Sequence, residues 1–234
     1  MLLQIRDMTE CDIPGAVVVI QDAFADDPYS KWVFNEGFSK ERNRVSLTLR
    51  CRWGIRHALF QVACDQESSP PGRVIGVAMW LPPKLSTPSP SYYSWLAGNL
   101  ASWDLWVRQG ITNIIHGRSS LNLKRYYLWK EGQAKAQGEL WSDPKGYYFC
   151  NIITVAPDAQ GKGIGKALAA EVLAKADAEG RWAYLESSRD EPNVKIYEKM
   201  GFKLKREMSL TDEGDDITLY CMLRPPQVSN AVPG

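Results

Sequence analysis

The chain has 234 residues, of which 44% are hydrophobic and 24% charged, so it can bury a large core and falls within the size range of one large domain. Its 28 Lys and Arg residues nearly balance its 27 Asp and Glu residues. A balanced chain has no overall field that attracts nucleic acid or an anionic membrane, so we expect neither as a partner. Any basic site must be local.

The thiol and imidazole groups are few and widely spaced. An odd number of cysteines set mostly among apolar residues predicts reduced core thiols in a reducing compartment. The histidines, His57 and His116, have no cysteine or carboxylate partner at a zinc-like separation, so we expect no metal site. The cysteines are Cys11, Cys51, Cys64, Cys150 and Cys221.

The first half of the chain begins with a predicted strand at 2–7, whose short apolar run is too brief for a signal peptide or a membrane span. We therefore expect a cytoplasmic protein without membrane contact. Asp12 and Pro14 then start a helix that ends before Asp26. A second helix is predicted at about 39–57. Strands at 59–64 and 74–81, joined by a polar loop, form a predicted hairpin.

The second half begins with an aromatic-rich segment, 84–145, which we predict to be helices joined by loops. Strands at 147–155, 182–187, 202–208 and 217–223 alternate with helices at 164–179 and 193–200. Strands and helices around one sheet predict an α/β or α+β fold. We expect one domain over 1–224 and a flexible tail over 225–234.

A glycine-rich turn between a predicted strand and a helix carries the strongest chemical signal. Backbone N–H groups at such a helix start converge on one point where the helix dipole is positive, which suits a phosphate. Gly161, Gly163 and Gly165 allow close backbone approach, while Lys162 and Lys166 add positive charge. The spacing matches neither the Walker loop nor the dinucleotide fingerprint, so the sequence predicts a different pyrophosphate ligand.

The run from Val155 to Leu168, Val-Ala-Pro-Asp-Ala-Gln-Gly-Lys-Gly-Ile-Gly-Lys-Ala-Leu, resembles the acetyl-CoA motif V-x-P-x-x-Q/R-G-x-G-x-G/A of the GNAT acetyltransferase superfamily. A second run, Asn193 to Phe202, is similar to the family's N-x-x-x-x-Y-x-x-x-G-F. Shorter likenesses at 23–26, 185–188 and 220–224 resemble the branch that contains puromycin N-acetyltransferase. The resemblance implies a mixed, largely antiparallel, splayed sheet flanked by helices, and acetyl-CoA as co-substrate.

The resemblance also implies how the cofactor is held. The pantetheine arm is expected to add backbone hydrogen bonds beside the strand end Ile153-Thr154-Val155. A backbone N–H near Asn151 to Ile153 would polarise the acetyl carbonyl, and we include Asn151 among the substrate contacts. The pyrophosphate would lie on the loop and helix start: Gln160, Gly161, Lys162, Gly163, Ile164, Gly165 and Lys166.

Tyr197 matches the family tyrosine that protonates the departing thiolate, and Asn193 matches its cofactor-contacting asparagine. The acceptor amine must lose a proton before it can attack, because an ammonium group has no lone pair. Glu186, at a strand end, is our candidate base. Backbone carbonyls and water are the alternative.

Acceptor contacts are expected where the first helix ends, at Asp26 and Asp27, together with Trp80 and Tyr92. Turn and core roles would account for the same residues. Our prediction is an N-acetyltransferase that moves acetyl to a primary amine of a small molecule by direct attack on the thioester. Two alternatives stay open: acetylation of a protein lysine or N-terminus, and a non-catalytic acyl-CoA-binding module. The sequence leaves the oligomeric state open.

Overall fold

The computed structural model describes residues 2–34, 38–69, 72–83 and 121–227. Two short 3-10 turns, Glu10–Asp12 and Pro157–Ala159, precede α1 and α6. The strands are β1 (Leu3–Asp7), β2 (Leu59–Asp65), β3 (Arg73–Leu81), β4 (Tyr147–Val155), β5 (Trp182–Ser187), β6 (Lys203–Asp212) and β7 (Asp215–Arg224). The helices are α1 (Ile13–Ala23), α2 (Pro28–Val33), α3 (Lys40–His57), α5 (Leu123–Leu140), α6 (Ile164–Ala178) and α7 (Asn193–Glu198).

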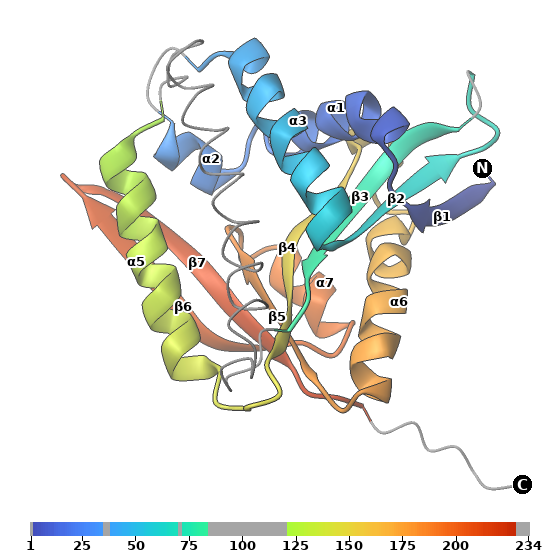
Figure 1. The fold of residues 1–234 in the computed structure, drawn as a ribbon. Coiled ribbons are helices and arrows are strands. Elements are labelled where there is room, and N and C mark those ends of the chain that lie inside the picture. Colours follow the sequence, from blue (N-terminus) through green and yellow to red (C-terminus); the bar gives the residue numbers. More distant parts are fainter. Residues whose placement is uncertain (1, 35–37, 70–71, 84–120, 228–234) are drawn as a thin grey trace, which may run out of the picture.

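These strands form one sheet in the order β1-β2-β3-β4-β5-β7-β6 (Figure 1). Within the described ranges, neighbouring strands are antiparallel except β4 and β5, which are parallel. The predicted hairpin of β2 and β3 is confirmed, with Leu59 opposite Trp80. The expected mixed, largely antiparallel sheet flanked by helices is confirmed as well.

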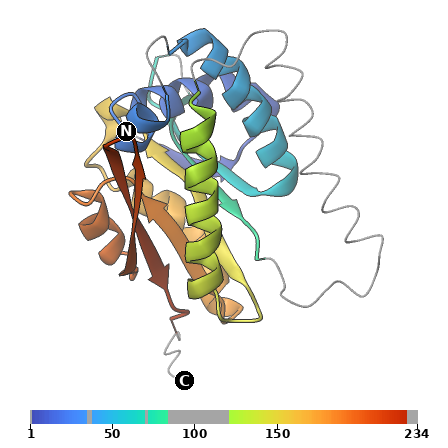
Figure 2. The same cartoon turned by 90° about the vertical axis from the view of Figure 1, so that its left-hand side faces the viewer.

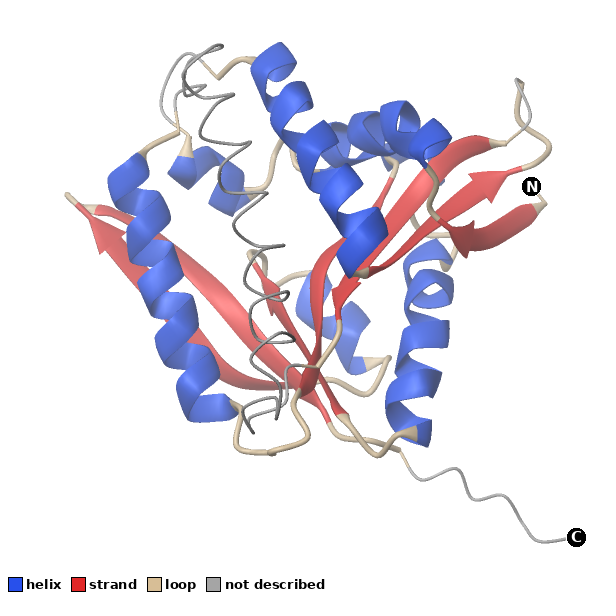
Figure 3. Cartoon of the chain, viewed as in Figure 1, coloured by secondary structure: helices blue, strands red, loops and turns tan. Residues whose placement is uncertain are grey.

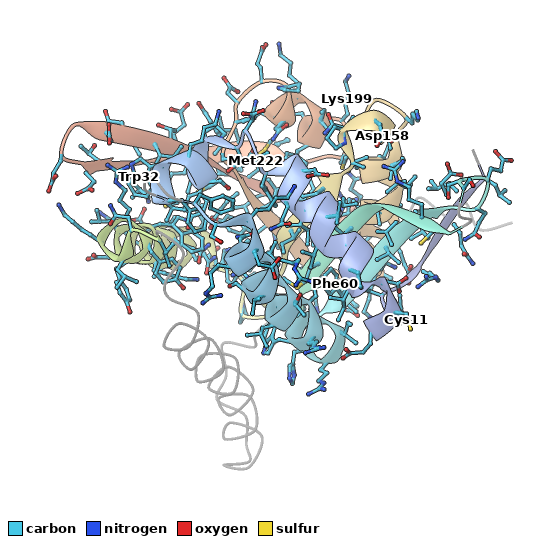
Figure 4. All side chains as sticks on the ribbon, turned by 90° about the horizontal axis from the view of Figure 1, so that it is seen from above. Cys11, Trp32, Phe60, Asp158, Lys199 and Met222 are labelled. Carbon is cyan, nitrogen blue, oxygen red and sulfur yellow. The ribbon has the colours of Figure 1, made fainter. Side chains whose placement is uncertain are left out.

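Helices cover both faces of the sheet (Figure 3). α1 and α3 lie on one face of the half formed by β1 to β4, and α6 and α7 lie on the other face (Figure 1). α5 runs along β6 on the same side as α3, as the turned view in Figure 2 shows. Seen from above, Phe60 lies by α3, whereas Asp158 and Lys199 lie on the far side of the sheet, by α6 and α7 (Figure 4).

Two apolar clusters hold these layers together. The larger lies between α1, α6 and the central strands and includes Val17, Val62 and Leu168. The second lies under α5 and includes Ala136 and Tyr184, both 0% exposed. β3 is buried from Val74 to Trp80 because helices cover both of its faces, which explains its nearly continuous apolar sequence.

Several predicted elements have the bounds expected from the sequence, and others differ. Strands 147–155 and 182–187 are confirmed at both ends. α2 was not predicted; Asp27 caps it by accepting from the Ser30 N–H at 2.9 Å. β6 and β7 are longer than predicted because they meet in a tight turn in which Glu213 and Gly214 have φ of 54° and 94°.

Two local predictions need correction. Asp12 precedes α1 as expected, but its side chain makes no capping bond, because it pairs with Arg6 at 2.7 Å and accepts from the Thr9 N–H at 2.8 Å. Cys11 is exposed and is not a core residue, while the other four thiols are free and buried as predicted. Most of the aromatic-rich segment, 84–120, and the tail beyond Gln227 lie outside the described residues.

The sheet splits between its two central strands. Tyr147 to Cys150 of β4 pair with Trp182 to Leu185 of β5. Beyond that last pair, β4 continues beside β3 alone and β5 beside β7 alone, within the part of the chain that the structure describes. The two parallel strands therefore open into a V with one free edge on each arm, as expected for a splayed sheet (Figure 1).

Candidate active site

The loop between β4 and α6 has the backbone shape that its glycines permit. Gly161 and Gly163 have φ of 76° and 77°, in the left-handed region where a Cβ is strained. Gly163 is the N-cap of α6. A Cβ at either position would meet no atom within 4 Å, so the space beside both glycines is open.

The start of α6 presents unpaired backbone donors. Its first intrahelical bond runs from the Ala167 N–H to the Gly163 carbonyl at 3.0 Å. The N–H groups of Ile164, Gly165 and Lys166 therefore have no acceptor in a preceding turn of the helix. Together with the helix dipole, these donors favour an anion such as a phosphate group.

Side chains of the same loop support its shape. The Gln160 side-chain amide donates to the Val155 carbonyl at 3.2 Å, and the Lys162 ammonium donates to the Asp158 carbonyl at 3.2 Å. Asp158 in turn pairs with Arg73 at 2.7 Å. The predicted cofactor residues from Gln160 to Lys166 thus lie on one short segment.

The open arm of β4 contains the other predicted cofactor residues. Ile153 and Val155 are half-buried, while Thr154 is buried at 6% exposure. Their backbone lies on the strand edge that has no strand partner beyond Cys150 among the described residues. Such an edge can accept an extended ligand as an additional strand.

A β-bulge lies where the V begins. Met79 of β3 pairs with Ile152, but the next residue, Trp80, pairs with Cys150, so Asn151 is the extra residue on β4. A bulge removes one residue from the ladder and redirects its backbone groups. The predicted donor region, Asn151 to Ile153, therefore coincides with the one irregularity in this strand pair.

Tyr197 lies on α7 and is partly buried against the larger apolar cluster. Its ring contacts Phe202 at 6.2 Å between centroids. Burial raises the pKa of Tyr197 above its ordinary value, and the nearby Cys150 thiol adds to the shift, so the phenol stays protonated at neutral pH. Among the described residues, the Tyr197 hydroxyl has no hydrogen-bond partner and is free to donate to a ligand.

Asn193 ties the start of α7 to the end of β5. Its side-chain amide donates to the Ser187 hydroxyl at 3.2 Å. Ser187 also donates to the Arg189 carbonyl at 2.8 Å, which closes the turn between β5 and α7. Asn193 therefore helps to orient the helix that carries Tyr197.

Glu186 directly follows the last residue of β5 that pairs with β4. Its carboxylate accepts from the Tyr184 hydroxyl at 2.7 Å and from the Gln133 side-chain amide at 2.8 Å. Burial raises the pKa of Glu186, and the hydrogen bonds from Gln133 and Tyr184 partly oppose that shift. A carboxyl group with a raised pKa is a stronger base for an ammonium proton than an ordinary glutamate.

Most of the residues predicted to contact the acceptor amine are buried or already paired with other side chains. Both Asp27 oxygens are occupied, one by the Ser30 N–H and the other by the Ser188 hydroxyl, and Asp27 is 6% exposed. Asp26 is exposed and pairs with Lys31 at 3.0 Å. Trp80 is 1% exposed within the core, and Tyr92 lies outside the described residues.

Sequence reasoning missed the residues that surround Glu186. Tyr184 lies two residues earlier on the same strand, so strand alternation could have placed both on one face. Gln133 comes from α5, 53 residues away in the sequence, and no local pattern predicts that contact. Ser188 reaches Asp27 across 161 residues.

A separate cavity lies elsewhere, between α1, β3 and residues 156–158. It has a volume of about 620 Å³ and is lined in part by Gly15, Arg73 and Asp158. It includes none of the residues predicted to contact acetyl-CoA or the acceptor. We therefore place the candidate site in the V and not in this cavity.

In the described parts of the chain, no cluster of three His, Cys, Asp or Glu side chains could hold a metal ion. None of the described helices is long and apolar enough to cross a bilayer.

Comparison with known proteins agrees with this geometry. Residues 123–204 match the model of the acetyltransferase (GNAT) domain, and this range contains β4, the loop, α6, β5 and α7. Residues 123–204 therefore have the sequence pattern of a GNAT acetyltransferase domain. This match supports an N-acetyltransferase that uses acetyl-CoA as its co-substrate.

Solved structures of acetyltransferases share the fold at low sequence identity. A histone acetyltransferase HPA2 and related acetyltransferase from Corynebacterium glutamicum aligns with a TM-score of 0.56 and 19% identity over 99% of this chain and 100% of that one. PaiA N-acetyltransferase from Thermoplasma acidophilum, in complex with coenzyme A, has a TM-score of 0.55 and 14% identity over 96% and 99% of the two chains. The putative acetyltransferase yncA from Salmonella typhimurium, solved with acetyl-CoA, has a TM-score of 0.51 and 14% identity over 100% and 99%.

Proposed function

We propose that this chain is a GNAT enzyme that transfers the acetyl group of acetyl-CoA to a primary amine of a small molecule, by direct attack of the amine on the thioester. The observation that carries the proposal is the convergence at the start of the V. The Asn151 bulge and Glu186 each follow the last paired row of β4 and β5, and Tyr197 packs against the apolar cluster that contains Cys150 of that row.

In this proposal acetyl-CoA lies in the V. Its pyrophosphate accepts hydrogen bonds from the N–H groups of residues 161–166, and its pantetheine arm runs beside Ile153 to Val155. The acetyl carbonyl lies at the bulge, where a backbone N–H of Asn151 to Ile153 stabilises the negative charge that develops on its oxygen. Two solved relatives that contain coenzyme A or acetyl-CoA support a cofactor site in this fold.

Two side chains then carry out proton transfers in the chemical step. Glu186 takes the proton from the acceptor ammonium, and the amine nitrogen forms a bond to the thioester carbon. As the tetrahedral intermediate collapses, the C–S bond breaks and Tyr197 donates its proton to the departing thiolate. The second proton of the attacking nitrogen passes to solvent, which reprotonates Tyr197, so the products are a neutral amide and free coenzyme A. The raised pKa of each group supports its role, because Glu186 becomes a stronger base and Tyr197 remains protonated.

Aromatic side chains near Glu186 favour a partly apolar small-molecule acceptor. Tyr29 of α2 contacts the Trp129 ring of α5 at 5.1 Å, and Tyr126 contacts the same ring at 5.8 Å. The pKa of Tyr29 is raised by burial, with smaller contributions from Tyr126, Asp27 and Glu186. The Trp129 and Tyr126 rings lie on α5, the helix whose Gln133 donates to Glu186. Aromatic walls with one charged group are typical of small-ligand sites.

The decisive experiment measures release of free thiol from acetyl-CoA in the presence of three separate acceptor sets: small apolar amines, lysine-containing peptides and N-terminal peptides. We expect release with the small amines. Release with peptides alone would favour the protein acceptor, and cofactor binding without release in any set would favour the non-catalytic module.

A further inference from the structure

The side chain of Glu186 is held from two elements. Its Oε1 accepts from the Tyr184 hydroxyl on β5 at 2.7 Å, and its Oε2 accepts from Gln133 Nε2 on α5 at 2.8 Å. Gln133 is 7% exposed and Tyr184 is 0% exposed, so water competes little for these bonds. The Gln137 side chain, one turn further along α5, also lowers the pKa of this carboxyl.

The orientation of the Gln133 amide is determined by its neighbours. The Lys130 ammonium lies 3.3 Å from Gln133 Oε1 and can only donate. An ionised carboxylate can only accept, so the NH₂ group of Gln133 must face Glu186. Lys130 therefore fixes the donor that Gln133 presents to the carboxylate.

We propose that Gln133 is a positioning residue for the base Glu186, so that helix α5 sets both the direction and the basicity of that carboxylate. This inference rests on the proposed function, in which Glu186 accepts the proton of the acceptor amine. The two partners of the carboxylate act differently. The NH₂ group that Gln133 turns to the carboxylate can only donate and favours the ionised form, whereas the Tyr184 hydroxyl can donate to the carboxylate and accept from the protonated acid.

Helix α5 is held in place by core packing and by hydrogen bonds at its start. Ala136, in the next turn of the helix, is 0% exposed within the cluster under α5. At the start of the same helix, Arg125 donates to Asp212 at 2.9 Å and to the Trp32 carbonyl at 2.8 Å. Gln133 therefore belongs to a helix that is anchored at both the core and the β6–β7 hairpin.

The test compares wild type with Gln133→Met, which keeps the side-chain length and removes the donor. Lys135→Met, on an exposed position of α5, is the matched control. Two readouts are needed: the titration of the Glu186 carboxyl by carbon-13 NMR without acetyl-CoA, assigned with Glu186→Gln, and the pH profile of kcat/KM. Because one donor to the ionised form is lost, we expect both midpoints to move to higher pH by about one unit.

Gln133→Leu, which also removes the donor, provides a second variant if Gln133→Met does not fold, and the same upward shift is expected from it. An unchanged carboxyl titration in a folded variant would overturn the positioning role. A carboxyl titration that shifts while the acid limb of kcat/KM stays in place would also overturn the positioning role. Amine-dependent turnover by the wild-type enzyme would in that case leave the proposed function intact. A wild-type enzyme that binds acetyl-CoA but gives no amine-dependent turnover would overturn the proposed function and this inference together.

Discussion

Cys150 of β4 and Leu185 of β5 form the last paired row of the two parallel strands. The next residues along the two arms are Asn151, which bulges out of the ladder with β3, and Glu186, whose carboxylate is held by α5. One break in strand pairing therefore leaves β4 with an edge that has no strand partner among the described residues, and the bulge and the candidate base both directly follow the last paired row.

The first prediction concerns Gly163. Gly163→Ala places a methyl group in the space beside the loop and should lower the affinity for acetyl-CoA by about tenfold or more, which corresponds to about 1.4 kcal/mol. Isothermal titration calorimetry measures the effect. The matched control is Gly214→Ala in the β6–β7 turn, where φ is 94° and a Cβ also meets nothing within 4 Å.

Both glycine variants should lose similar stability, about 1–2 kcal/mol, because each forces a side chain into the left-handed region. Only Gly163→Ala should lose cofactor affinity. Equal affinities in the two folded variants would refute the loop as the pyrophosphate site.

The second prediction concerns Tyr197. Tyr197→Phe should lower kcat by roughly 100-fold to 10,000-fold, the usual contribution of a general acid, with little change in acetyl-CoA affinity. The hydroxyl has no partner among the described residues, so its removal should leave the melting temperature nearly constant. Tyr220→Phe is the control, and turnover equal to wild type when chemistry limits the rate would remove Tyr197 from the mechanism.

The third prediction is the pH dependence due to Glu186. Burial raises its pKa, so the carboxyl is neutral and unable to accept a proton over a wider acidic range than an ordinary glutamate. The rate should fall as pH drops through that raised pKa, and Glu186→Gln should abolish this limb and lower kcat/KM. Glu207→Gln, at an exposed position of β6, serves as the control and should keep the wild-type profile.

The same shift has a consequence for stability. Since the folded state holds the Glu186 proton more tightly than the unfolded state does, the free energy of unfolding should decrease as pH rises between the ordinary and the raised pKa. Chemical denaturation of Glu186→Gln should lack that decrease. An identical pH dependence in both proteins would contradict the raised pKa.

The fourth prediction concerns the pair of Asp12 and Arg6, which joins the start of α1 to β1. The Arg6 guanidinium lowers the pKa of Asp12 to about 2, with the Thr9 N–H contributing. Asp12→Asn should cost about 1–2 kcal/mol at neutral pH, after allowance for the 36% exposure of Arg6.

The sign of this effect follows from the lowered pKa. The stabilisation is present above the ordinary pKa of aspartate and is lost as pH falls through about 2, so the unfolding free energies of wild type and Asp12→Asn should converge there. Asp7→Asn, at an exposed neighbouring position, should show no such convergence. A constant difference between wild type and Asp12→Asn down to pH 2 would argue against the ion pair as its source.

Local sequence patterns predicted the parts of the site that depend on local backbone shape. Gly161 and Gly163 require left-handed conformations, and the alternation of strand and helix around them is visible in the sequence. The positions of Asn193 and Tyr197 came from a second local motif. These residues needed no knowledge of distant contacts.

The remaining features depend on contacts between distant segments. Asp27 accepts a hydrogen bond from Ser188, which comes from the turn after β5, and no local pattern predicts that contact. Gln133 reaches Glu186 from a helix whose polar sequence gives no sign of that partner. The turn between β6 and β7 was predicted to be longer than it is, because the mostly charged run from Asp212 to Asp216 resembles a loop. In the structure β6 ends at Asp212 and β7 begins at Asp215.

The central claim is that acetyl-CoA lies in the V with its pyrophosphate at the start of α6. The most direct measurement is a titration of nitrogen-15-labelled protein with acetyl-CoA, followed through the backbone amide resonances. The account predicts the largest shifts at residues 151–155 and 161–166, with the β6–β7 turn at 213–214 unchanged. Saturable binding that leaves both of those segments unperturbed and shifts amides elsewhere would contradict it.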